Sequence, residues 1–136
     1  MLFRSAKNKK HSSVFMDRFF FVSGAVAALI GVALGAFGAH SLRTKLSPEM
    51  LNIFEVGVRY QMYHAFGLIA VALAMARWPA AHLNAAGWAF IVGILIFSGS
   101  LYLLSTTDAR WLGAITPLGG LAFLLGWAIL VWSIGR

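Results

Sequence analysis

The feature that most constrains this chain is a run of 21 residues, Phe19 to Ala39, without a charged side chain. About 20 apolar residues in a helix cross a hydrocarbon core of roughly 30 Å. Composition agrees, because 60% of the residues are hydrophobic and only 11% are charged, whereas soluble domains carry about 25% charged residues. We therefore expect an integral membrane protein. A cleaved secretory signal is the weaker alternative. The apolar segment of such signals is usually only about 7–15 residues long, which is shorter than the run from Phe19 to Ala39.

Three more uncharged segments follow, and helix-start signals precede two of them. Ser47-Pro48 and Thr116-Pro117 each place a capping hydroxyl before a proline that suits the first helical turn. The short connections make neighbouring helices antiparallel. The sequence thus predicts an all-α fold, a polytopic membrane protein built as an antiparallel four-transmembrane-helix bundle. The expected parts are a basic N-terminal tail over residues 1–18 and a transmembrane domain over residues 19–136, with spans at 19–39, 58–76, 85–104 and 116–134.

The distribution of lysine and arginine near the helix ends predicts the orientation. With the N-terminus inside, the inner side holds seven basic residues and the outer side four; if translation starts at Met16 rather than Met1, the count becomes three against four. We expect both termini in the cytoplasm and the protein in the inner cell membrane. The basic residues flank apolar runs and form no continuous patch, so we expect no nucleic-acid partner. The inner set is Arg4, Lys7, Lys9, Lys10, Arg18, Arg77 and Arg136, and the outer set is Arg43, Lys45, Arg59 and Arg110.

Every predicted span carries a row of small residues, which lets helix backbones approach closely in lipid. We favour packing within the chain as the role of these rows. The alternative is that the row on the first span docks a second copy, giving a homo-oligomer, or another membrane subunit. The glycines that form the helix-packing seam are Gly24, Gly31, Gly35 and Gly38 on the first span and Gly119 and Gly126 on the last.

Polar residues gather at one depth of the predicted bundle. Such residues are costly in lipid and usually face the protein interior, so we expect a polar cluster or a shallow cavity in the outer half. Ser98-Gly99-Ser100 also suits a loosened helical backbone. The candidate residues are His40, Arg59, Tyr60, Gln61, His64, Ser98, Ser100, Tyr102 and Thr116.

His64 and Arg59 each have two readings. For His64 we favour a hydrogen bond to Ser98, Ser100 or Tyr102; a ligating or titrating role, including a bis-histidine haem with His40, is the less favoured alternative. Arg59 is placed to pair with Glu55 at i, i+4, or to contact a lipid phosphate. The chain has no cysteine and no carboxylate within a span, so we expect no metal, no cofactor and no enzymatic activity.

Several stretches together resemble one known family. They are residues 31–40 (GVALGAFGAH), 60–64 (YQMYH), 97–102 (FSGSLY), 116–120 (TPLGG) and 126–128 (GWA). The chain resembles the YgdD-like family of small inner-membrane proteins, which has relatives among small eukaryotic transmembrane proteins. The resemblance covers about residues 17–133 and implies a four-helix membrane fold of unknown function. It also implies that residues 1–16 are an extension.

These observations favour a non-enzymatic membrane protein that serves as an accessory or as a lipid-binding or small-molecule-binding component. Membrane lipids are then its expected partners. The alternative is a transporter or channel subunit with a pathway near His64 and Ser98. That alternative requires an oligomer, because a single bundle filled by its own side chains leaves no room for a pore.

Overall fold

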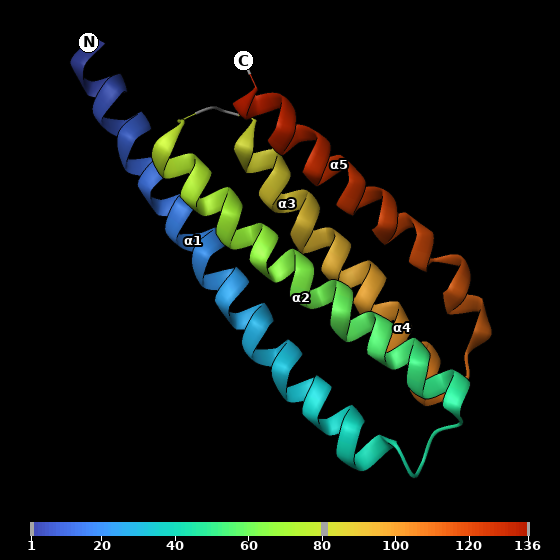
Figure 1. Cartoon of the computed structure of the whole chain (residues 1–136). Helices are drawn as coiled ribbons and strands as arrows, with labels where there is room; N and C mark the ends of the chain where they lie inside the picture. Colours follow the sequence, from blue (N-terminus) through green and yellow to red (C-terminus); the bar gives the residue numbers. More distant parts are fainter. Residues whose placement is uncertain (1, 80–81, 136) are drawn as a thin grey trace.

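The computed structural model describes residues 2–79 and 82–135, with side chains from residue 14 onward, and this part of the chain contains helices and no strand. Figure 1 shows the helices packed as antiparallel rods, and α1 begins at the end of the bundle at which α5 ends. The all-α fold class is therefore confirmed. The elements are α1 (Leu2–Phe37), the π-helical η1 (Gly38–Leu42), α2 (Pro48–Arg77), α3 (Leu83–Gly93), the π-helical η2 (Ile94–Ser98), α4 (Gly99–Thr107), the 3-10 helix η3 (Arg110–Ala114) and α5 (Thr116–Ile134).

The central element is α2, which packs against α1 on one side and against the third rod, residues 83–107, on the other. Within the third rod, α3 packs chiefly on α5 and α4 chiefly on α2, with η2 contacting both neighbours. The two outer rods, α1 and α5, therefore lie on opposite sides of the α2–third rod pair. This arrangement gives α2 more buried residues than any other helix in the described part of the chain.

The two helix-start signals have different outcomes. The Ser47 hydroxyl accepts a hydrogen bond from the Met50 amide at 3.2 Å, so the predicted cap of α2 is confirmed. The predicted Thr116 cap is wrong, because Ile115 occupies the N-cap position and the Thr116 hydroxyl donates to the Leu112 carbonyl at 3.2 Å. A capping residue needs an extended backbone, but the preceding η3 leaves Ile115 helical, with φ −85° and ψ −33°.

Two of the predicted boundaries also change. The α1 helix begins at Leu2, so it includes most of the segment predicted as a basic tail. The predicted span 85–104 becomes the longer third rod, which η2 interrupts with five π-helical residues. The loosened backbone expected at residues 98–100 is thus found at residues 94–98.

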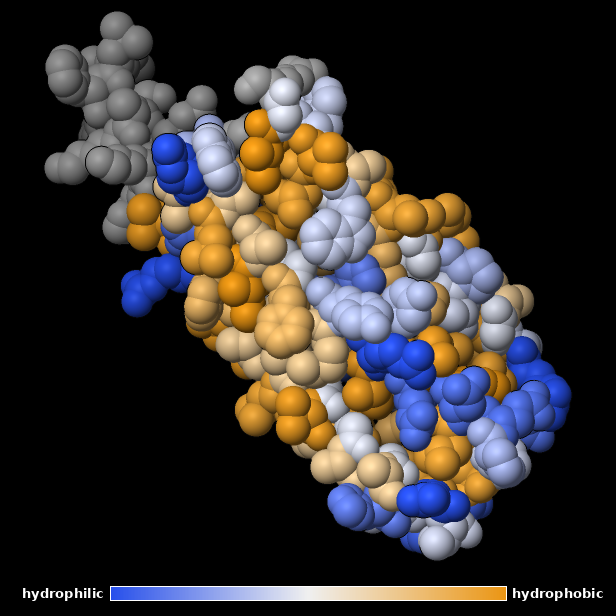
Figure 2. Space-filling view, viewed as in Figure 1, coloured by the Kyte–Doolittle hydropathy of each residue, from blue (hydrophilic) through white to orange (hydrophobic). Residues whose placement is uncertain are grey.

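Three segments of the described chain are long and apolar enough to cross a membrane: Val14–Leu42, Leu83–Thr107 and Arg110–Ile134. The remaining long helix, α2, is not among them. Polar side chains such as Gln61 and His64 lower its hydropathy. In Figure 2 apolar side chains cover most of the visible face, and hydrophilic side chains gather where α2 begins and α4 ends.

The glycine seam of α1 faces α2 of the same chain. A Cβ atom on Gly24 would lie 2.6 Å from the Ala65 carbonyl oxygen, and one on Gly31 would lie 2.6 Å from the Met62 sulfur. Because α2 covers this stripe, it is not free to dock a second copy. Gly119 and Gly126 of α5 likewise contact the third rod, at the Phe97 backbone and the Phe90 ring.

Candidate functional site

Gln61 links three rods at the middle of the bundle. It lies on the inward face of α2 and is only 4% exposed. Its Nε2 donates to the Ala27 carbonyl of α1 at 2.8 Å, and its Oε1 accepts from the Tyr102 hydroxyl of α4 at 2.8 Å. A buried amide must find its hydrogen-bond partners within the protein, and Gln61 does so on both sides of α2.

His64 lies one turn further along the same face of α2 and is also 4% exposed. Its Nδ1 lies 2.7 Å from the Tyr60 carbonyl, and its Nε2 accepts from Trp127 Nε1 at 3.1 Å. An indole N–H only donates, so Nε2 is the acceptor and Nδ1 carries the proton. The imidazole also stacks on the Phe123 ring at 3.4 Å.

The expected partners of His64 were therefore wrong. The hydroxyls of Ser98, Ser100 and Tyr102 are engaged elsewhere, and Trp127 of α5 takes their place. Trp127 is not among the candidate residues predicted from the sequence. The signal that points to it is a tryptophan deep within a span, where its N–H needs an acceptor.

The remaining hydroxyls join other pairs of rods. Ser98, at the end of η2, is fully buried and donates to the Gly57 carbonyl of α2 at 2.7 Å. Ser100 of α4 and Thr116 of α5 share a hydrogen bond of 2.7 Å between their hydroxyl oxygens. The polar residues thus form separate interhelical bonds, spread along α5 from Thr116 at its start to Trp127 eleven residues further on, rather than a single cluster.

Three of the candidate residues lie outside this set of bonds. His40 and Arg59 are exposed, and no described side chain accepts or donates a hydrogen bond to either. Tyr60 is 39% exposed and contributes its carbonyl to His64. The expected Glu55–Arg59 ion pair is absent from the described side chains, where Asp108 and Arg110 form an ion pair of 3.3 Å.

A lateral groove of about 480 Å³ lies between α1 and the third rod, with α2 as its floor. At its end nearer the chain termini, Phe19 packs on Trp88, with ring centroids 5.5 Å apart. Further out, Gly99 leaves the groove open, because a Cβ atom there would meet nothing within 4 Å. The lining residues are Phe19, Ser23, Val26, Ala27, Ile30, Leu34, Gln61, Leu68, Trp88, Ile91, Ile94, Leu95, Gly99 and Tyr102.

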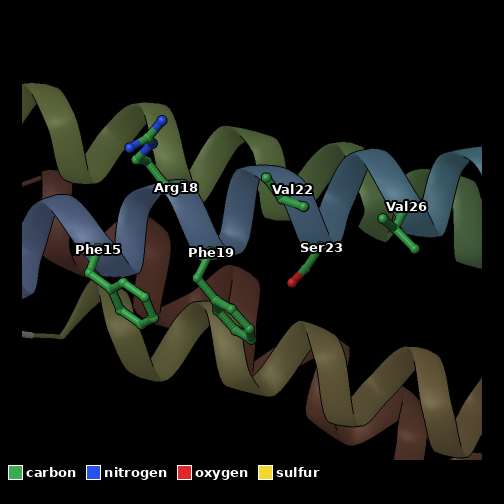
Figure 3. Close-up of a pocket in the computed structure, with 6 residues that line it drawn as sticks. All are labelled: Phe15, Arg18, Phe19, Val22, Ser23 and Val26. Atoms are coloured by element: carbon green, nitrogen blue, oxygen red, sulfur yellow. The ribbon is translucent and has the colours of Figure 1, made fainter.

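The lateral groove continues along α1 toward the start of that helix as a depression that shares Phe19, Ser23 and Val26 with it. Figure 3 shows Phe15, Phe19 and Ser23 pointing from α1 toward α3, whereas Arg18 points the other way. The walls of the groove and its extension are therefore mainly aromatic and aliphatic, with one cation, Arg18, beside the extension.

A second hollow, the Arg59 crevice, lies on the other side of the α1–α2 contact. Its volume is about 310 Å³. Its one positive and one negative side chain come from the same helix, α2. The lining residues are Gly35, Phe54, Glu55, Val58, Arg59, Met62 and Tyr63.

The described residues contain no group of three or more histidine or carboxylate side chains placed to hold a metal ion. In His64, both ring nitrogens already have partners within the protein. A bond from its Nε2 to a haem iron would have to displace Trp127.

Comparisons with known proteins find a family and no activity. Residues 34–120 match a family described as a protein of unknown function (DUF423). A similar relative is the UPF0382 membrane protein YwdK of Bacillus subtilis, 50% identical over 113 residues that cover 82% of this chain and 92% of the relative. Another is the UPF0382 membrane protein SH2409 of Staphylococcus haemolyticus, 45% identical over 85% of this chain and 94% of the relative. No solved structure matches the chain.

Proposed function

Since this chain belongs to the DUF423 family of uncharacterised membrane proteins, we propose that it is a four-span, non-enzymatic component of the inner membrane that binds lipid in the lateral groove. The observation that carries the proposal is the groove itself, an apolar channel open to the side of the bundle with a polar pair at its floor. The resemblance to the YgdD-like family, which implies a four-helix membrane fold, also supports the proposed four spans.

The surface of α2 supports a fourth span. Arg59 and Arg77 are exposed and stand 18 residues apart, which is about 27 Å at 1.5 Å per residue and close to the thickness of a hydrocarbon core. The polar Gln61 and His64 are buried, so they lower hydropathy without meeting lipid. The exposed residues between the two arginines are uncharged: Tyr60, Tyr63, Phe66, Ala70, Leu73 and Ala76.

The proposed orientation has both termini in the cytoplasm. An even number of spans places both ends on one side, in agreement with Figure 1. Arg18 of α1 and Arg77 of α2 are both exposed near that end of the bundle. Lysine and arginine favour the cytoplasmic side of short loops, and the count of seven against four, which includes Arg4, Lys7, Lys9 and Lys10, supports an inner-face location for the end with the termini.

Lipid is the ligand class that the walls of the lateral groove favour. Ligand pockets usually measure about 300–1,000 Å³ and are lined by apolar side chains with a few polar groups, and this groove of about 480 Å³ fits that description. Its open side faces the hydrocarbon of a bilayer. An acyl chain or a similar elongated apolar molecule would lie along α1, with Gln61 and Tyr102 beneath it.

The transport alternative has less support. Ser98 and His64 are buried and hydrogen-bonded to Gly57 and Trp127, so a pathway past them would require both interhelical bonds to open. The same hydrogen bonds support the non-enzymatic part of the proposal, because the buried polar groups described above already bond to neighbouring helices.

A groove-filling substitution tests the proposal. Gly99→Leu places a side chain in the open groove, and Gly120→Leu is the matched control, since a Cβ on Gly120 of α5 would lie 3.9 Å from the Phe97 ring and outside the groove. Membranes carrying each protein would be labelled with a photoactivatable fatty acid incorporated into phospholipid, and the crosslinked peptides would be mapped by mass spectrometry.

We expect crosslinks at Trp88, Ile91 and Leu95 in the wild-type protein and in Gly120→Leu, and their loss in Gly99→Leu. Equal labelling of all three proteins at these positions would show that the label reports the general lipid surface. That result would remove the groove as a binding site.

A further inference from the structure

Arg59 lies nearer the centre of the proposed membrane than the outer ends of the uncharged stretches of the neighbouring helices. Gly35 of α1 is level with Val58 of α2, because a Cβ on Gly35 would lie 3.4 Å from Val58 Cγ1. From Gly35, α1 continues without a charged residue to His40. Arg59 follows Val58 toward the inner side, so its Cα lies about six residues below His40, or roughly 9 Å.

The contacts of α2 with the third rod indicate the same depth for Arg59. Gly57 of α2 lies against Tyr102 of α4, where a Cβ on Gly57 would be 2.9 Å from the Tyr102 ring. From Tyr102, α4 carries no charged residue before its end at Thr107. Arg59 therefore lies at the edge of the hydrocarbon in the outer half of the bundle, under the four-span topology proposed above.

A cation at this depth needs an anion. Charged side chains within a membrane usually pair with one another or extend to the headgroups. The nearest acidic side chain on its own helix, Glu55, does not come within ion-pair distance of Arg59 among the described residues. Arg59 instead lines the crevice, together with Tyr63 and the side-chain-free surface of Gly35.

We propose that the Arg59 crevice binds the phosphate of an anionic phospholipid of the outer leaflet. The planar guanidinium of Arg59 donates two parallel hydrogen bonds to phosphate oxygens, the geometry that arginine supplies and lysine does not. The hydroxyl of Tyr63, which is 54% exposed and lines the same crevice, is a second donor. The apolar sides of Val58 and Met62 then receive the upper part of an acyl chain.

This site is separate from the lateral groove. Gln61 and Leu68 of α2 line the groove, whereas Glu55, Arg59 and Tyr63 line the crevice on the far side of the α1–α2 contact. The inference rests on the proposed four-span topology, since α2 must cross the membrane for Arg59 to meet the outer leaflet. It does not rest on occupancy of the groove.

Native mass spectrometry of the full chain in mild detergent, with added phosphatidylglycerol or phosphatidylcholine, tests the assignment. The variants are Arg59→Gln, Arg59→Lys and Glu55→Gln, and Arg110→Gln serves as a matched outer-side control because Arg110 already pairs with Asp108. We expect the wild-type protein to bind phosphatidylglycerol more tightly than phosphatidylcholine. We expect Arg59→Gln to weaken this binding about fivefold or more, the contribution of one cation at an anionic lipid surface.

The affinity of Arg59→Lys for phosphatidylglycerol should fall between those of the wild-type protein and Arg59→Gln, because lysine keeps the positive charge but cannot donate two parallel hydrogen bonds. Glu55→Gln should bind phosphatidylglycerol at least as well as the wild-type protein, and Arg110→Gln should match it. Equal binding of the two lipids, loss in Glu55→Gln, or equal loss in Arg59→Gln and Arg110→Gln would each overturn the proposal.

Two further arms separate the possible sources and the two proposals. Glycerol 3-phosphate is added as a soluble competitor, and displacement of phosphatidylglycerol by it at millimolar concentration would assign the site to a free anion and overturn the lipid assignment. Gly99→Leu, which fills the groove, should keep the full preference for phosphatidylglycerol. If Gly99→Leu abolishes that preference, the lipid sits in the groove and the crevice proposal fails while the proposed function stands.

Discussion

Trp127 Nε1 donates a hydrogen bond to Nε2 of His64 across 3.1 Å and so connects α5 to α2. The donor cannot exchange roles with the acceptor, because an indole nitrogen only donates. The bond therefore selects one tautomer of His64 and one rotation of α5 about its axis. It lies at the depth where Gln61 connects α2 to both α1 and α4.

Trp127→Phe should remove the hydrogen bond at Nε2 of His64 and leave its tautomer unchanged, because the Tyr60 carbonyl still accepts from Nδ1. The substitution keeps an aromatic ring beside Phe90 but leaves Nε2 without a donor, at a cost of about 0.6–1.7 kcal/mol in the free energy of unfolding. Nitrogen NMR of ¹⁵N-histidine-labelled protein should report a protonated Nδ1 for His64 in both proteins, and a changed Nε2 chemical shift in the variant as its hydrogen bond is lost. The exposed His82 is the internal control. A wild-type His64 protonated at Nε2 would contradict the assigned bond.

Gln61 and Tyr102 should be energetically coupled. A double-mutant cycle with Gln61→Leu and Tyr102→Phe removes both partners of one buried bond, and we expect a coupling of about 0.6 kcal/mol, with an upper value of about 1.7 kcal/mol. Unfolding in bicelles by added dodecyl sulfate measures it. Ser105→Ala is the control partner, because the Ser105 hydroxyl donates to a carbonyl of its own helix. Full additivity between Gln61→Leu and Tyr102→Phe would show that the bond does not form in lipid.

Two adjacent glycines of α5 should respond differently to alanine. A Cβ on Gly119 would overlap the Phe97 backbone of η2, whereas a Cβ on Gly120 would meet only the Phe97 ring at 3.9 Å. Gly119→Ala should cost about 1–3 kcal/mol through overpacking, and Gly120→Ala should be neutral or slightly stabilising because alanine favours helix. Thermal unfolding in detergent compares them. Equal melting temperatures would argue against the close approach of α5 and η2.

The proposed topology predicts which introduced cysteines are accessible. The chain has no cysteine, so single variants give unambiguous labelling in intact cells with a membrane-impermeant maleimide. Thr44→Cys and Ala109→Cys should be labelled from outside, and Trp78→Cys and Gly135→Cys only after permeabilisation. Labelling of Trp78→Cys in intact cells would mean that α2 does not cross in the proposed direction.

Local signals predicted the helices well where the determinants were themselves local. The uncharged run from Phe19 and the Ser47 cap depend on neighbours in sequence, and both reappear as helices in the structure. The Thr116 cap failed because its backbone conformation depends on the preceding η3, which has no strong sequence signal. The length of α1 before residue 14 was missed for a related reason, since a polar segment attached to a long helix carries no stop signal.

Depth was easier to predict than pairing. The antiparallel register placed Gln61, His64, Ser98 and Tyr102 in the same half of the bundle. In the structure Gln61 meets Tyr102, whereas Ser98 meets Gly57, seven residues before His64. Which of them bond depends on the rotation of each helix about its own axis, and hydropathy does not specify that rotation for helices that are apolar all round. Trp127 was missed because, although its position within a span indicates a need for an acceptor, the sequence does not specify that the acceptor is His64 on another helix.

The π-helical η2 has a consequence for the length of the chain. A π-helical turn contains an additional residue, and each residue in a helix advances the side-chain direction by about 100°. The third rod uses this offset to present α3 to α5 and then α4 to α2. Deleting one residue between 94 and 98 would restore a regular helix and swing Tyr102 away from Gln61. The number of residues in this stretch is therefore constrained independently of their identity. Relatives should keep the same number of residues here even where the residues themselves differ.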